Sequence, residues 1–467
     1  MNVLEAFKPE DIQGNIVRGY RLHHVRYLML EVADRAAARR FLAASASGGD
    51  ADVPPIQTEA QWTVKPPYCF NVQLTAPGLL ALGVPASDYA TFPDEFRDGM
   101  ASRALKLSDV GDSAPETWPA PFDAPERIHL IASIHSDDPE QLDRVQAMAA
   151  RAFTLLGTRD GRDLARSEVV FGYVDGISQP KFIGVHDPSR ESDEERFDPL
   201  GTVLLGYPTR MEGVRFGVPT PRALGFNGSF NAFRVLGQDA AGFERFLTRV
   251  ADEVIESGRA DALLPPGGPR QVGPGLDEHG ALREIVAAQV VGRWRNGVPY
   301  ETSPDTMHPD PEVSLTNFDY GYRSRCPVGS HMRRCNPRGG PIVQKVANYT
   351  RRLVRRGMSY GPDFDPDHPD ERERGLLGNF LGADLGAQFE AVMYDWLNLG
   401  LQHPNLTGSN DPLLGANDPM TSWFDLRGRD GETIRVHEVP RFVRARGGAY
   451  TFLPSLAAIR YLGGLTG

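Results

Sequence analysis

The chain has 467 residues, of which 40% are hydrophobic and 24% are charged, and its formal net charge is −11. This composition is typical of a globular protein with enough apolar material for a large core. Acidic residues are in excess and the basic residues are scattered, which disfavours nucleic acid and favours a small molecule as the main partner.

Other features of the sequence narrow the class of protein further. No apolar run approaches the ~18 residues that cross a bilayer. The first residues, MNVLEAFKPEDIQGNIVRGY, are acidic where a secretory signal has a basic start, so we expect a cytoplasmic protein. Cys69, Cys326 and Cys335 show neither C-x-x-C nor C-x-x-C-H spacing, which predicts free thiols and argues against covalent haem attachment.

Residue periodicity predicts an alternation of short elements in the first part of the chain. In chain order the prediction is a strand at 24–32, a helix at 33–46, a strand at 68–75, a short helix at 78–83, a strand at 127–136 and a helix at 138–156.

A related succession recurs in the second part. It comprises strands at 201–207 and 229–237, helices at 240–257 and 283–294, strands at 350–356 and 374–383, and a helix at 385–400. Pro-, Gly- and acid-rich stretches at 186–199, 265–280 and 361–375 are predicted to be surface loops.

This order of elements predicts the fold class. The sequence has no G-x-G-x-x-G turn and no long apolar strands, so a doubly wound nucleotide-binding fold is disfavoured. We expect an α+β protein with two split βαβ halves, residues 1–200 and 201–467, each an antiparallel sheet with helices on one face.

Familiar catalytic motifs are missing. The eleven histidines form no H-E-x-x-H pattern, and neither a P-loop nor a G-x-S-x-G elbow is present. The segment at 172–180 instead reads GYVDGISQP, in which Gly172, Gly176 and Pro180 bracket Asp175. Such a turn aims one carboxylate into a cleft, although an Asx-type turn that only links two elements has the same composition.

Two more segments could carry chemistry. In SRCPVGSHMRRCNPRGG (324–340) a single histidine, His331, lies among turn-forming and basic residues, as either a metal ligand or a hydrogen-bonded core histidine. In RRLVRRGMSYGP (351–362) arginines flank two apolar residues, which indicates either a solvated basic face or a strand that points one guanidinium inward.

Together these segments resemble the longer-chain branch of the dye-decolorizing peroxidases, haem enzymes that reduce hydrogen peroxide. The similar segments, in chain order, are EDIQGNIVRGY, GYVDG, HMRRCNPR, RRGMSYGP and GGAYTFLPSLAAIRYL. The resemblance implies two ferredoxin-like halves of the dimeric α/β-barrel type, with one haem b in the C-terminal half. It also implies oxidation of dyes, phenols or similar one-electron donors through a ferryl intermediate.

The resemblance implies a role for each matching residue. His331 is expected to bind the haem iron, Asp175 to be the distal carboxylate, and Arg355 to be the distal arginine that also contacts the haem. Arg352 and Arg356 are the nearest rivals of Arg355.

A later carboxylate is expected to accept a hydrogen bond from the iron-binding histidine. Asp384 is the first choice for this partner and Glu390 the second, both in LGADLGAQFE.

Two other functions use the same cofactor. One is a non-catalytic haem-binding or haem-trafficking protein, and the other is a pathway-specific haem oxidant. A carrier has no need of Asp175 with Arg355, so the pair favours catalysis. The expected partners are H2O2 and small aromatic reductants, without nucleic acid or a membrane span, and a homo-oligomer is left open.

Overall fold

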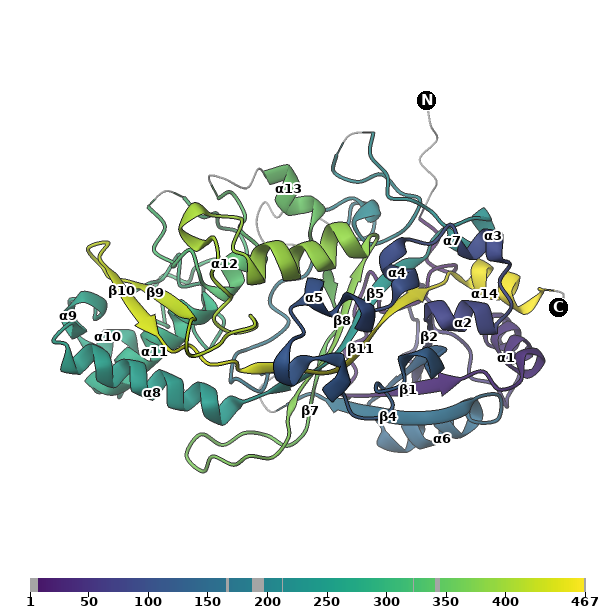
Figure 1. The fold of residues 1–467 in the computed structure, drawn as a ribbon, viewed down its shortest axis with the longest axis horizontal. Helices are drawn as coiled ribbons and strands as arrows, with labels where there is room; N and C mark the ends of the chain where they lie inside the picture. The colour runs from purple at the N-terminus through teal and green to yellow at the C-terminus, as the bar shows by residue number, and fades with distance from the viewer. Residues whose placement is uncertain are drawn as a thin grey trace.

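Helices and antiparallel strands build the molecule together (Figure 1). The structure is a computed structural model that describes residues 7–164, 168–186, 197–211, 213–321, 323–340 and 345–465. Residues 187–196 of the predicted loop at 186–199 therefore lie outside the described residues. Among the described residues, no helix combines the length and apolarity needed to traverse a lipid bilayer.

The first half of the chain forms a β-α-β-β-α-β unit. Its strands are antiparallel and lie in the order fourth, first, third, second, which is the ferredoxin-like arrangement. Its elements are β1 (His24–Glu31), α1 (Arg35–Ser47), β2 (Cys69–Leu74), β3 (Leu130–Ser136), α6 (Pro139–Ala149) and β4 (Thr154–Arg162).

A series of short helices lies between β2 and β3. They are α2 (Ala76–Ala81), α3 (Ala86–Tyr89), α4 (Asp94–Asp98), η1 (Ala101–Arg103), α5 (Ala104–Leu107), η2 (Gly111–Ser113), η3 (Pro115–Thr117) and η4 (Pro125–Arg127).

The second half repeats the same strand order. Here β11 takes the fourth place, β5 the first, β8 the third, and β6 with β7 the second. The elements are β5 (Ser229–Gln238), α8 (Ala240–Glu256), β6 (Val354–Arg355), β7 (Met358–Tyr360), β8 (Gly375–Gly382), the π-helices η8 (Leu385–Glu390) and η9 (Val392–Asn398), and β11 (Val443–Leu453). The repeat confirms the predicted α+β class with two ferredoxin-like halves.

The two halves share one nine-stranded sheet. Strand β11 pairs with β5 along its whole length and meets β2 where Phe452 lies opposite Leu74. The order along the sheet is therefore β4-β1-β3-β2-β11-β5-β8-β6, with β7 also paired to β8.

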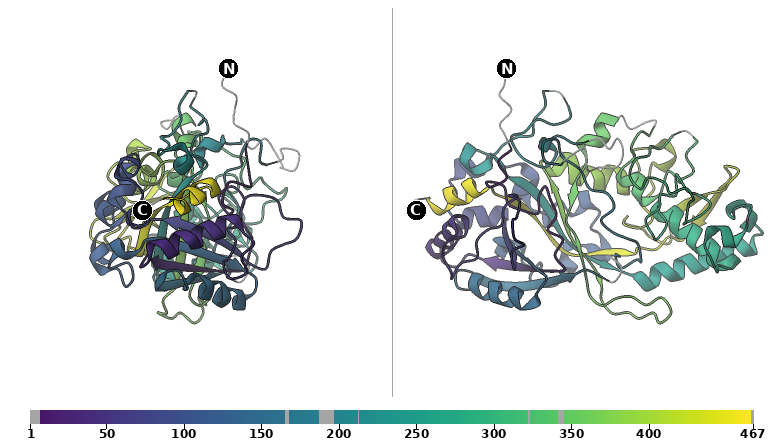
Figure 2. Two further views of the ribbon diagram at one scale, coloured as in Figure 1. Left: turned by 90° about the vertical axis from the view of Figure 1, so that its right-hand side faces the viewer. Right: turned by 180° about the vertical axis from the view of Figure 1, so that it is seen from behind.

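A long insertion between α8 and β6 forms most of a second lobe. Figure 1 shows this lobe at the left and the first half of the chain at the right, and Figure 2 shows the same separation from behind. The lobe contains α9 (Ala260–Leu263), α10 (Pro269–Val272), α11 (Glu278–Val291), α12 (His331–Cys335), α13 (Lys345–Thr350), β9 (Trp423–Arg427) and β10 (Thr433–His437). The remaining elements are η7 (Leu200–Thr202), α7 (Arg222–Gly225), η10 (Pro404–Leu406) and α14 (Leu456–Gly463).

Two large apolar cores lie side by side. One core contains side chains from β1, β2, β3, β5 and β11, and the other contains side chains from α8, α11, β9 and β10. Phe380 and Leu414 pack against both cores, Leu376 packs against the second, and all three are still partly exposed. These side chains mark the seam where the two cores meet.

Several predicted elements differ from the structure. The predicted loop at 265–280 contains α10 and the first residues of α11, and only Val354–Arg355 of the predicted strand at 350–356 forms a strand. The helix predicted at 138–156 ends at Ala149, and Thr154–Arg162 forms β4, which pairs with β1. The strand predicted at 201–207 is a 3-10 turn, η7, followed by further turns, although Val203, Leu204 and Leu205 are fully buried. These three residues are apolar because they are buried in the core, and not because they pair with a neighbouring strand.

A buried ion pair joins β5 to the segment after α5. Both guanidinium nitrogens Nη1 and Nη2 of Arg234 donate to Asp109 at 2.6 Å, and both side chains are buried. Asp109→Asn leaves a buried positive charge without its counter-charge, so we expect a loss of ~3–5 kcal/mol in the free energy of unfolding, measured by urea denaturation. The matched control is Asp425→Asn, which breaks the exposed two-bond pair with Arg435 on β9 and β10. Its expected cost is below ~1 kcal/mol, and equal costs for the two variants would contradict the prediction.

Candidate active site

Helix α12 presents His331 at its first residue, and polar contacts hold this short helix in place. Just before the helix, the Ser330 hydroxyl donates to the Gln289 carbonyl of α11. Within the helix, the buried Arg334 guanidinium donates to the carbonyls of Trp396 at 3.2 Å and of Ser409 at 3.0 Å. His331 is therefore fixed between α11 and η9.

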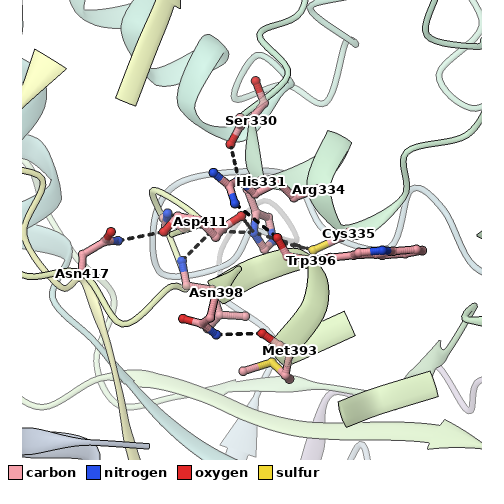
Figure 3. Close-up of polar contacts among 12 residues, drawn as sticks. Ser330, His331, Arg334, Cys335, Met393, Trp396, Asn398, Asp411 and Asn417 are labelled. Carbon is pink, nitrogen blue, oxygen red and sulfur yellow. Dashed lines mark hydrogen bonds and ion pairs between the residues drawn. The ribbon is translucent and has the colours of Figure 1, made fainter. Parts of the chain in front are cut away.

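Asp411 is the carboxylate partner of His331. Figure 3 shows the Asp411 side chain directed at the imidazole ring, and Nδ1 of His331 lies 3.1 Å and 3.2 Å from its two oxygens. Oδ1 of Asp411 also accepts the backbone N–H groups of Leu413 at 2.9 Å and Leu414 at 2.7 Å. The Asp411 side chain is 0% exposed and that of His331 is 19% exposed, so the pair is fixed yet the imidazole remains reachable.

Burial and charge oppose each other at this pair. Burial lowers the pKa of His331, but Cys335 and Asp411 raise it, and the balance lies well above the ordinary value. Burial raises the pKa of Asp411, but the charge of His331 and its hydrogen bond lower the pKa by more. The pKa of Asp411 therefore falls below its usual range. The ionised carboxylate therefore holds the Nδ1 proton, and Nε2 is the nitrogen that can exchange its proton for a metal.

The expected carboxylate partners of His331 were wrong. Asp384 caps η8 and accepts the Ala387 N–H at 2.7 Å. Glu390 is buried and accepts both Arg103, at 2.6 Å and 2.9 Å, and the Tyr450 hydroxyl at 3.0 Å. Each carboxylate accepts its hydrogen bonds from other residues, and neither contacts the imidazole.

A weak signal for Asp411 exists in the sequence. It lies in SNDPLLG, where an Asx-Pro turn is followed at once by two leucines, in a stretch that is otherwise loop-like. An acid in a loop that turns back into apolar residues is a candidate for a buried, positioned carboxylate.

Cys335 lies one helical turn after His331. Its Sγ is 3.7 Å from Nε2 and 3.8 Å from Nδ1 of the imidazole. The sulfur is thus nearly equidistant from the two ring nitrogens and packs against the ring.

The GYVDG loop places Asp175 at the surface of the site. Gly172 and Gly176 have φ values of 77° and 75°, a left-handed conformation that favours glycine. The loop is pinned by the Val174 N–H, which donates to the Arg295 carbonyl at 2.9 Å. Asp175, between these fixed points, has an exposed side chain that can reach a ligand.

Arg355 is held against the same loop. It lies on β6, its backbone N–H donates to Oε1 of Gln179 at 3.0 Å, and its guanidinium donates to the Ser178 carbonyl. The structure therefore brings Arg355 to the segment that carries Asp175.

The rival arginines have other partners. Nη1 of Arg352 lies 2.8 Å from Oδ2 of the buried Asp198. Arg356 donates from Nε to the Asn15 carbonyl at 2.9 Å and from Nη2 to the Val17 carbonyl at 3.0 Å. Both side chains tie segments of the fold together.

A polar cleft lies between Ser178 and Gln179, which follow the loop of Asp175, and Asn336 and Arg338, which follow α12; neither Asp175 nor His331 is among its lining residues. It is lined by Ser178, Gln179, Lys181, Thr316, Asn317, Phe318, Asp319, Asn336, Arg338, Asn348, Tyr349 and Arg352. Nearby, burial together with the charges of Arg338 and Arg355 lowers the pKa of Arg293 to about 10. The guanidinium groups thus lie close enough to repel one another, which favours an anionic ligand.

These residues fit a haem. Nε2 of His331 is a nitrogen donor of the type that binds haem iron, and the carboxylate behind it is a usual partner of such a ligand. The cationic cleft suits two propionate carboxylates, and the partly exposed Leu376, Phe380 and Leu414 suit an apolar ring.

We expect Asp411→Asn to weaken haem affinity or peroxidase activity about 10- to 100-fold. The amide oxygen can still accept the Leu413 and Leu414 N–H groups, but it lacks the charge that stabilises the Nδ1 proton of His331. Haem titration and steady-state turnover measure the effect. Asp418→Asn, at an exposed acid of the same loop, is the matched control, and equal behaviour of the two variants would contradict the prediction.

The chain is similar along nearly its whole length to curated dye peroxidases. It is 25% identical to the dye-decolorizing peroxidase of Exidia glandulosa, over 98% of this chain and 87% of the relative. It is 27% identical to the multifunctional dye peroxidase DyP2 of Amycolatopsis sp., over 97% of this chain and 95% of the relative.

A solved structure has the same fold. The decolorizing peroxidase of Auricularia auricula-judae superposes with a TM-score of 0.77 at 22% identity, covering 98% of this chain and 100% of that one. No protein-family model matches the chain.

Proposed function

We propose that the chain is a haem peroxidase of the dye-decolorizing family and that it reduces hydrogen peroxide at a haem b bound by His331. The observation that supports this assignment best is the pair of His331 and the buried Asp411, in a chain whose GYVDG segment and arginine at position 355 the structure brings together. Phenols and dyes are the proposed electron donors.

The proposal gives each part of the cleft a role in holding the cofactor. His331 binds the iron through Nε2, and Asp411 keeps the imidazole oriented through Nδ1. Arg338, which lines the cleft, would hold a propionate, and Arg352, which also lines it and is paired with Asp198, would add positive charge there. The sequence has no C-x-x-C-H, the motif of thioether attachment, so the proposed cofactor is haem b. Bound haem supplies an iron that exchanges electrons with peroxide and with the aromatic donor.

Asp175 and Arg355 handle the proton and the charge of the peroxide. A carboxylate oxygen of Asp175 accepts a proton from one peroxide oxygen and returns it to the departing oxygen. The Arg355 guanidinium, fixed by its bond to the Ser178 carbonyl, stabilises the negative charge that develops on the departing oxygen. A haem carrier would have no use for this pair.

The absorption spectrum of the haem-loaded protein tests the function. We expect a Soret band that changes within milliseconds of adding one equivalent of H2O2 and returns when a phenol is added. Haem binding without a response to peroxide would identify a carrier, and absence of haem binding would refute the assignment.

A further inference from the structure

Arg295 holds the GYVDG loop through both its side chain and its backbone. It lies shortly after α11, which ends at Val291. Its Nη1 donates to the Phe171 carbonyl at 2.8 Å, and its own carbonyl accepts the Val174 N–H at 2.9 Å. Asp175 follows Val174 directly, so Arg295 fixes the backbone that carries the candidate distal carboxylate.

Two helices anchor the guanidinium of Arg295. Nη2 donates to Oε1 of Glu244 on α8 at 2.8 Å, and Nε lies 3.1 Å and 3.3 Å from the two oxygens of Glu284 on α11. All three guanidinium nitrogens therefore have a partner, which fixes the planar group in one orientation. Because the donor is charged, its bond to the Phe171 carbonyl is stronger than a bond between neutral groups.

The first residues of the GYVDG segment fit this arginine. A Cβ atom at Gly172 would lie 3.1 Å from Nη1 of Arg295, and Gly172 has a φ of 77°, so glycine suits the position on both counts. The ring centroid of Tyr173 lies 5.4 Å from the guanidinium carbon, and the Tyr173 hydroxyl donates to the Ala287 carbonyl of α11 at 3.0 Å. The loop is thus bound both to α11 and to Arg295.

Helix α11 also positions the segment of the proposed iron ligand. The Gln289 carbonyl accepts the hydroxyl of Ser330, the residue before His331. Ala287 and Gln289 both lie near the end of this helix, so one rigid element sets the places of the GYVDG loop and of His331. Arg295 is the charged link between that element and the loop.

Arg355 holds the loop on the other side of Asp175. Its guanidinium donates to the Ser178 carbonyl, and its backbone N–H donates to the Gln179 side chain at 3.0 Å. The exposed Asp175 side chain lies between the two attachments. The place of its carboxylate therefore follows from the backbone, which Arg295 fixes before Asp175 and Arg355 fixes after it.

We infer that Arg295 is a positioning residue for the peroxide reaction, because it fixes the loop backbone and with it the carboxylate of Asp175. This inference rests on the proposed function, in which Asp175 moves the peroxide proton. Such a transfer requires the carboxylate within hydrogen-bond reach of the peroxide. A displacement of about 1 Å, caused by a change away from the reacting atoms, can cost about 100-fold in rate.

Hydrogen exchange of the haem-loaded chain tests whether Arg295 holds the loop. Arg295→Gln removes the charge and the bond to the Phe171 carbonyl. We expect amide exchange in peptides that cover residues 169–180 to become about tenfold faster, because the loop opens more often. An unchanged exchange rate in these peptides would overturn the inference.

Arg283→Gln is the matched control. Arg283 lies on α11 and donates to Oε2 of Glu244 at 2.8 Å, so it shares a carboxylate with Arg295. Within the part of the chain that the structure describes, it donates no hydrogen bond to the loop. Glu244 keeps one arginine in either variant, and Glu284 is 21% exposed, so both variants should fold. We expect wild-type exchange in the loop of Arg283→Gln.

The rate of reaction with H2O2 tests whether the held loop matters for the chemistry. We expect Arg295→Gln to react about 10- to 100-fold more slowly, with unchanged haem content and an unchanged resting Soret band. Arg295→Lys should recover part of the rate, because an ammonium group can donate to the Phe171 carbonyl but lacks the planar fork. Arg283→Gln should react at the wild-type rate, and an equal loss in Arg283→Gln and Arg295→Gln would overturn the inference.

A double-mutant cycle with Asp175→Asn separates positioning from general destabilisation. If Arg295 acts through Asp175, then Arg295→Gln should cost less than about twofold in the Asp175→Asn background, because the carboxylate is already absent. Rate losses that simply multiply would show that Arg295 acts in another way, and would overturn the inference.

The outcomes separate this inference from the proposed function. A slow Asp175→Asn together with a wild-type rate in Arg295→Gln would overturn the inference while the peroxidase assignment stands. A wild-type rate in Asp175→Asn would refute the proposed role of Asp175 and the positioning role with it. Hydrogen exchange needs no peroxide, so it reports on the loop in either case.

Discussion

His331→Ala is expected to lose haem, with an affinity loss beyond the about 10- to 100-fold that removal of an outer partner costs. The imidazole is the proposed iron ligand, and alanine has no donor to replace Nε2. The ratio of haem to protein after gel filtration and the intensity of the Soret band measure the loss.

Controls separate loss of the ligand from loss of the fold. Removing the imidazole leaves Asp411 buried without its counter-charge, so circular dichroism must show that the variant is folded. Imidazole added to the buffer should restore haem binding by occupying the vacated space. His437→Ala, at an exposed histidine of β10, should retain haem. Normal haem binding by His331→Ala would show that another residue is the ligand.

Arg355→Leu is expected to retain haem but to react with peroxide about 100- to 1,000-fold more slowly. Leucine keeps much of the side-chain volume but removes the charge that stabilises the departing oxygen. Stopped-flow absorption after mixing with H2O2 measures the rate, and the resting spectrum reports haem retention.

Two other arginine variants sharpen this test. Arg355→Lys keeps the charge but not the planar fork, so an intermediate rate is expected. Arg356→Leu removes the bonds to the carbonyls of Asn15 and Val17, so its main effect should be on stability. A wild-type rate in Arg355→Leu, or a larger rate loss in Arg356→Leu, would mean that the wrong arginine has been identified.

Strands and helices with a clear period were predictable from the sequence. Strand β5 and helix α8 form within one residue of the expected ranges 229–237 and 240–257. Strand β4 was missed because TLLGTRDGR has glycines and charged residues in place of an alternating pattern. It is a strand because β1 offers it a partner edge, and pairing with another segment is invisible in local periodicity.

The candidate site was predictable where its residues lie in short, recognisable segments of the sequence. Asp175, His331 and Arg355 each stand in a short segment with its own turn or basic residues, and the structure brings Arg355 to the loop of Asp175. Their roles stay predictions that the variants test. Asp411 could not be paired with His331, because the two are 80 positions apart and only the fold of an irregular loop brings them together.

The position of β11 has a consequence for how the protein matures. Among the strands of the shared sheet β11 is synthesised last, yet it lies in the middle, between β2 and β5. During translation the ferredoxin-like unit of the first half can fold as each element leaves the ribosome, whereas the second half lacks its fourth strand until the end. Until then the facing edges of β2 and β5 stay unpaired, which makes them points where chaperones would bind nascent chains.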